Sequence, residues 1–83
     1  MKLFLLSQDE NGGYDTYDSC VVCAESEEDA KKIHPSGYRN DEVTEEEEKY
    51  GTWTTLSNVD AEYIGEAKEG SERGVVCSSF NAG

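Results

Sequence analysis

The side chains best suited to metal or redox chemistry lie together in the stretch SCVVCAESEEDAKKIHP at 19–35. Cys20 and Cys23 have the CxxC spacing of zinc and dithiol sites, and His34 follows them. A zinc ion would need both sulfurs at ~2.3 Å, which a tight turn between the cysteines normally provides. A redox dithiol would instead need the pair at the N-terminus of a helix. Either chemistry therefore depends on which element holds the two cysteines.

The residues around the two cysteines predict a β-strand rather than a turn. Val21 and Val22 are β-branched and belong to an apolar run within a predicted strand of roughly 14–24. Because residues i and i+3 of a strand project to opposite faces, we expect the two sulfurs to diverge. We therefore expect buried thiols, with no metal and no cofactor. A distorted site that combines one of these cysteines with His34 and Cys77 remains the alternative.

A short helix is predicted directly after this strand. Ser26 and Asp29 have the spacing of a capping box, in which the serine side chain accepts a hydrogen bond from the N–H three residues on. Pro35 cannot continue a helix and sets its end. Ala30 and Ile33 form a narrow apolar stripe, so the helix should pack on one face of a sheet.

Three further segments complete the predicted fold. Residues 3–7 are a strand-like apolar run followed by a hairpin signal, residues 58–67 alternate between apolar and polar side chains, and residues 75–80 form a last strand. Together these elements predict a single α+β domain over 1–83. Its architecture is a small, four-stranded, mainly antiparallel sheet with one helix packed on one face, in the order β-β-α-β-β.

The first apolar run, LFLL at 3–6, places apolar side chains on both faces of this sheet. One short helix covers only one face. We therefore expect the other face to meet a second copy of the chain, as in a homodimer, or a partner.

The segment at about 36–52 is a solvated, acidic excursion from the domain. Trp53 follows it and is expected to anchor it on the core. Thr44 and Glu47 have capping-box spacing, so one or two helical turns over 45–50 are an open alternative to a loop. We assign six carboxylates of this segment to a partner-binding surface. They are Asp41, Glu42, Glu45, Glu46, Glu47 and Glu48.

The charge balance limits the classes of partner. Nineteen acidic against seven basic residues give a net charge of −12, which repels nucleic-acid backbones and anionic lipid. The same field attracts a basic protein surface, including one that normally holds nucleic acid. No apolar run reaches the length of a membrane span or a secretory signal. We therefore expect a cytoplasmic protein with reduced thiols that binds neither nucleic acid nor membrane.

One basic group stands against this acidic background. It could hold a phosphate or a small nucleotide, because local donors can outweigh a screened distant field. The competing interpretation is that its lysines pair with Glu27 and Glu28 on a wet helix face. The residues of the basic group are Lys31, Lys32, His34, Tyr38 and Arg39.

The pattern YDTYDSCVVCAESEEDAKKIHP, then a tryptophan, then AEYIGEA and a terminal GVVCSSFNAG resembles a family of short, acidic proteins encoded by phages and prophages. The resemblance implies a bacterial host cell, and it assigns no residue a role. It implies a non-enzymatic antagonist of a bacterial defence system that occupies a basic surface of a host protein. A sponge for an anionic nucleotide signal and a phage accessory protein with a structural role are the alternatives.

Overall fold

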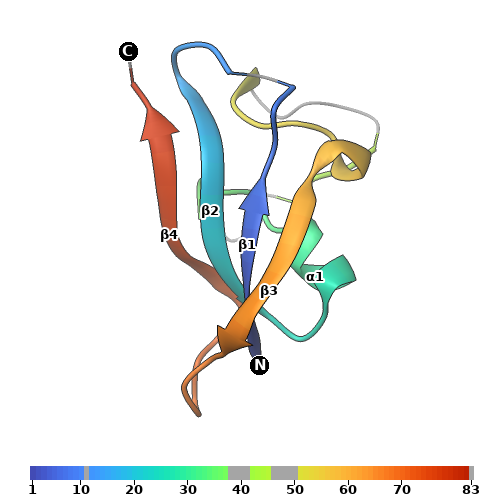
Figure 1. Ribbon diagram of the computed structural model, residues 1–83, viewed down its shortest axis with the longest axis vertical. Helices are drawn as coiled ribbons and strands as arrows, with labels where there is room; N and C mark the ends of the chain where they lie inside the picture. Colours follow the sequence, from blue (N-terminus) through green and yellow to red (C-terminus); the bar gives the residue numbers. More distant parts are fainter. Residues whose placement is uncertain (11, 38–41, 46–50, 83) are drawn as a thin grey trace.

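The computed structural model describes residues 1–10, 12–37, 42–45 and 51–82. Four strands form one antiparallel sheet in the spatial order β3-β1-β2-β4, with the helix α1 on one face (Figure 1). The predicted α+β class is therefore confirmed. The elements are β1 (Lys2–Ser7), β2 (Thr16–Ala24), α1 (Glu27–Lys31), a 3-10 turn η2 (Leu56–Asn58), β3 (Asp60–Glu66) and β4 (Gly74–Asn81).

Strand β1 lies inside the sheet, between β3 and β2, and its apolar residues serve both faces. Phe4 and Leu6 are buried on the face that α1 covers, whereas Leu3 and Leu5 are only half-buried on the other face. This difference follows from the two-residue alternation of a strand and from the single covering layer. The second face therefore keeps partly exposed apolar side chains.

The two cysteines of the CxxC motif point to opposite faces of β2, as the strand prediction requires. Cys20 pairs with Leu6 and belongs to the core, whereas Cys23 pairs with Leu3 and lies with its sulfur 3.6 Å from the sulfur of Met1. Burial raises the pKa of the Cys20 thiol to about 12. The described part of the chain contains no cluster of His, Cys, Asp or Glu side chains that could hold a metal ion.

The helix α1 begins as predicted but ends earlier than Pro35. The hydroxyl of Ser26 accepts a hydrogen bond from the N–H of Asp29 (3.1 Å), and Ala30 is buried against the sheet. Lys32 is the C-cap, and its carbonyl accepts a hydrogen bond from the N–H of Val43 (2.9 Å). The chain leaves the helix where Ile33 forms an antiparallel bridge with Glu42. Glu42 belongs to the returning segment, of which the structure describes residues 42–45 and 51–59.

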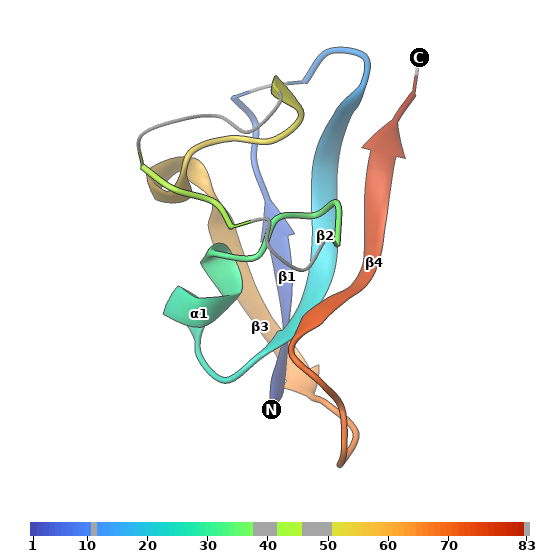
Figure 2. The same cartoon turned by 180° about the vertical axis from the view of Figure 1, so that it is seen from behind.

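That returning segment completes the core. Figure 2, seen from behind, shows α1 and the described residues 42–45 and 51–59 on the same side of the sheet. Trp53 is fully buried there, which confirms the predicted anchor, and Val43 and Val59 are buried beside it in the same cluster. The backbone N–H of Tyr17 in β2 donates to the carbonyl of Thr52 (2.8 Å). The predicted helical turns at 45–50 fall mostly outside the described residues.

A β-bulge changes the face assignment at the end of β3. Tyr63 pairs with Phe4 but Gly65 pairs with Leu3, so Ile64 is an extra residue in β3. The regular alternation predicted Tyr63 and Gly65 on one face. That assignment is wrong because the bulge moves Gly65 to the opposite face, where its φ of 155° suits glycine.

Candidate functional site

Arg73, from the loop before β4, joins three segments that are far apart in the sequence. Its Nε donates to both carboxylate oxygens of Asp29 in α1, at 2.9 Å each. Its Nη2 lies 3.5 Å from Oε1 of Glu42, in the returning segment. The hydrogen bond to Asp29 is the main cause of a raised Arg73 pKa, so the guanidinium stays charged. These contacts hold the returning segment beside the first turns of α1.

The Arg73 contacts bring acidic residues from two segments onto one side of the molecule. Glu27 and Glu28 are exposed in the first turn of α1, and Glu42 and Glu45 are exposed in the returning segment. We call these four residues the acidic surface. A lysine partly compensates Glu27, since the Nζ of Lys31 lies 3.8 Å from its carboxylate.

Two of the six carboxylates assigned from the sequence thus lie in this acidic surface. Glu42 contacts Arg73, and Glu45 is exposed beyond it. The other four lie outside the described residues. They are Asp41, Glu46, Glu47 and Glu48. The sequence did not indicate that Glu27 and Glu28 belong to the acidic surface. Their spacing predicted only that they pair with lysines of the same helix.

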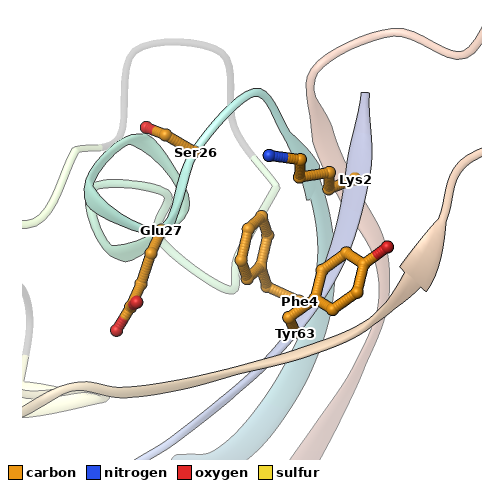
Figure 3. Close-up of a pocket in the computed structure, with 5 residues that line it drawn as sticks. All are labelled: Lys2, Phe4, Ser26, Glu27 and Tyr63. Atoms are coloured by element: carbon orange, nitrogen blue, oxygen red, sulfur yellow. The ribbon is translucent and has the colours of Figure 1, made fainter.

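A groove of about 320 Å³ lies between α1 and the β1–β3 edge of the sheet (Figure 3). In this view the Phe4 ring lies between α1 and Tyr63, and Glu27 flanks the groove from the helix side. The two rings meet edge to face, with centroids 6.0 Å apart. Tyr63 remains 55% exposed, so its ring offers an aromatic surface, and Lys2 lines the same groove together with Ser26 and Glu27.

The Tyr63 ring is held by a hydrogen bond along its own strand. Its hydroxyl donates to Oε2 of Glu66 (2.6 Å), and this bond is the main cause of a raised Tyr63 pKa. A cationic side chain laid on the ring would meet the ring face and nearby carboxylates together. The sequence placed Tyr63 on the inward face of a strand. Its exposure follows from β3 being an edge strand, and the order of strands cannot be read from local pattern.

The basic group assigned from the sequence is only partly assembled. A pocket of about 260 Å³ is lined by Lys31 and Lys32, but also by Glu28 and Leu56. Glu28 would repel an anion in this pocket, and Lys31 is already paired with Glu27. Tyr38 and Arg39 lie outside the described residues.

His34 is buried, whereas Lys32 of the same predicted basic group is exposed. The Nδ1 of His34 accepts a hydrogen bond from the N–H of Ser36 (3.1 Å). Its ring also packs edge-on against Tyr17, with centroids 6.0 Å apart. Since Lys32 is the C-cap of α1, His34 lies beyond the end of the helix. Its side chain therefore need not follow the helical spacing, and it points into the core instead of toward the exposed lysine side chains.

Comparison of the chain with protein-family models, with curated proteins and with solved structures gives no match. In the part of the chain that the structure describes, every helix is too short and polar to cross a bilayer. Function is therefore inferred from the geometry and charge of the surface.

Proposed function

We propose that the protein is a non-enzymatic binding protein whose acidic surface occupies a basic surface of a host protein. The observation that carries this proposal is the Arg73 bridge between Asp29 and Glu42. It positions the carboxylates of two segments before any partner arrives. A surface ordered in advance loses less entropy on binding than one that must be assembled.

The net charge of −12 supports the same proposal. Opposite potentials steer a basic partner toward the acidic side of the molecule and raise the association rate. The exposed Tyr63 ring supplies a specific contact, because an arginine or lysine of the partner can lie on it near the carboxylate of Glu66. In this proposal, charge attraction explains a fast association rate, and the aromatic contact explains a slow dissociation rate.

The resemblance to phage and prophage proteins supports a bacterial cytoplasmic setting. A host protein that binds nucleic acid carries a basic face, and an acidic protein seated there would block it. Antagonism of a host defence system is the biological role that we propose for such a block.

A second candidate function is the sequestration of an anionic nucleotide. The observation that favours it is the pocket that contains both Lys31 and Lys32. Charge-assisted hydrogen bonds from two lysines would stabilise a phosphate there. Glu28 in the same pocket weakens this candidate, and for that reason we rank it below protein binding.

Two charge-matched variants test the main proposal. The first neutralises the acidic surface through Glu27→Gln, Glu28→Gln, Glu42→Gln and Glu45→Gln. The second removes the same amount of charge elsewhere, through Asp60→Asn, Glu62→Gln, Glu69→Gln and Glu72→Gln. Affinity purification from the bacterial host, with mass spectrometry of bound protein and bound small molecules, identifies the ligand, and surface plasmon resonance measures the association rate.

We expect the first variant to associate with the protein partner at least about tenfold more slowly than the second, because only the first removes charge at the contact. Equal rates for the two variants would show that the acidic surface is not the contact. A bound nucleotide whose retention is lost in a Lys31→Ala, Lys32→Ala double variant would replace the proposal with the second candidate.

A further inference from the structure

Strand β4 is an edge strand whose described residues carry one protection against further pairing, a β-bulge at Val76. It pairs with β2 on one side only, and residues 76–81 are exposed. Val76 is 59% exposed and Phe80 is 45% exposed. Residues 74–83 contain no charged side chain and no proline. Such an edge offers unpaired backbone donors and acceptors together with apolar side chains, and is a template for another strand.

The opposite edge of the sheet, strand β3, differs from β4 because it carries charged side chains. Strand β3 carries Asp60, Glu62 and Glu66, so a second strand could pair with it only by desolvating carboxylates or bringing compensating cations. The β4 edge therefore lies in a neutral stretch, 74–83, of a chain whose net charge is −12. A partner for β4 needs no charge of its own.

We propose that β4 pairs antiparallel with β4 of a second copy of this chain, with the two-fold axis at Ser78. In this register Ser78 faces its own copy and Cys77 faces Ser79, and the bulged residue Val76 lies beside Phe80 at each end of the regular ladder. The last pair joins a β-branched and an aromatic side chain, a combination that stabilises neighbouring antiparallel strands. The Tyr17 ring supports Phe80 from β2, with centroids 4.8 Å apart.

Two arguments select a second copy as the occupant. The contact is self-complementary and places no carboxylate opposite another, so the repulsion between two chains of charge −12 acts only from a distance. The assembly also closes by itself, because pairing consumes both β4 edges and leaves the carboxylate-bearing β3 edges outside. A dimer, and no longer fibre, is the expected product.

The oligomeric state gives the first test. Sedimentation velocity should show twice the 9.2 kDa chain mass at high protein concentration, with a dimer fraction that rises as salt screens the repulsion. Val76→Lys should weaken the dimer at least about tenfold, because it acts at two symmetric positions. The matched control is Ile64→Lys, an exposed apolar residue on β3, which should leave the dimer intact. A monomer at every concentration and salt, or equal effects of the two substitutions, would overturn the proposal.

A cross-linking experiment tests the register without relying on Val76→Lys. Opposed residues of an antiparallel pair have Cα atoms ~4.5–5.5 Å apart, which is within disulfide range. In a Cys77→Ser background, Ser78→Cys should form a covalent dimer under mild oxidation at least about tenfold faster than Val76→Cys, since only position 78 faces itself. Slower or equal cross-linking at position 78 would contradict this register. These outcomes are independent of host-protein binding, which salt weakens rather than strengthens.

Discussion

His34 shows how burial can differ between residues that are neighbours in the sequence. It follows two lysines, but the structure buries it and uses its Nδ1 as an acceptor for the N–H of Ser36. The buried ring packs against Tyr17, and Thr52 Oγ1 lies 3.5 Å from its Nε2. Its role is therefore structural.

We predict that His34→Ala lowers the free energy of unfolding by ~2–4 kcal/mol, through a cavity and an unpaired N–H. Urea denaturation followed by Trp53 fluorescence measures this change. Lys32→Ala, one exposed position in the same turn, is the control and should change stability by less than ~0.5 kcal/mol. A His34→Ala protein of unchanged stability that has lost its ligand would instead identify His34 as a binding residue.

The Cys20 thiol should make stability depend on alkaline pH. Its folded pKa is raised to about 12 from a reference value of 9.0, so between these values the unfolded chain loses the proton and the folded chain keeps it. Stability therefore falls as pH rises from about 9, by at most ~1.4 kcal/mol per pH unit from this group. Urea denaturation across this range, with Cys20→Ala as the reference, isolates the contribution. Identical pH slopes for the two proteins would contradict it.

At the scale of elements, the local sequence pattern was sufficient to predict a strand or a helix start that depends only on neighbouring residues. The apolar run at 3–7 predicts a strand, and the Ser26 cap predicts the start of α1, because each signal spans a few residues. The early end of α1 depends on a backbone contact between Lys32 and Val43. The bulge at Ile64 depends on pairing with a distant strand. Neither contact can be recognised from neighbouring residues alone, so the sequence predicted neither the early end of α1 nor the bulge.

Arg73 is the clearest case of a long-range feature of the candidate site. Its partner Asp29 is 44 residues away in the sequence, and no spacing rule relates the two. The pattern did identify Glu42 as acidic and exposed. It could not show that an arginine from the β3–β4 loop holds Glu42 beside α1.

We predict that Arg73→Ala loosens the returning segment with little loss of global stability. The Arg73 side chain is 36% exposed and its partners Asp29 and Glu42 are 32% and 56% exposed, so loss of these pairs should cost less than ~1 kcal/mol. The amide of Val43, which donates to Lys32, should nevertheless exchange hydrogen at least about tenfold faster by NMR. Glu72→Ala, the neighbouring exposed residue, is the control and should leave exchange unchanged. An unaltered Val43 exchange rate in Arg73→Ala would show that the bridge does not order this segment.

At the scale of the whole molecule, acidic and uncharged residues occupy different parts of the surface. The acidic surface lies on the side that carries α1, whereas the neutral edge lies along β4 (Figures 1 and 2). A pair joined through β4 by a two-fold axis perpendicular to the sheet would present both acidic surfaces on the same side. Two such surfaces would bind an extended basic partner with a gain in effective concentration.

The ionic-strength dependence of association with the captured host protein tests the central proposal most directly. Stopped-flow measurement from about 0.01 M to about 0.15 M salt shortens the screening length from ~30 Å to ~8 Å. If the acidic surface steers the chain to a basic partner, the association rate falls at least about tenfold over this range, while the dissociation rate changes far less. An association rate that stays constant or rises with salt would contradict the proposal.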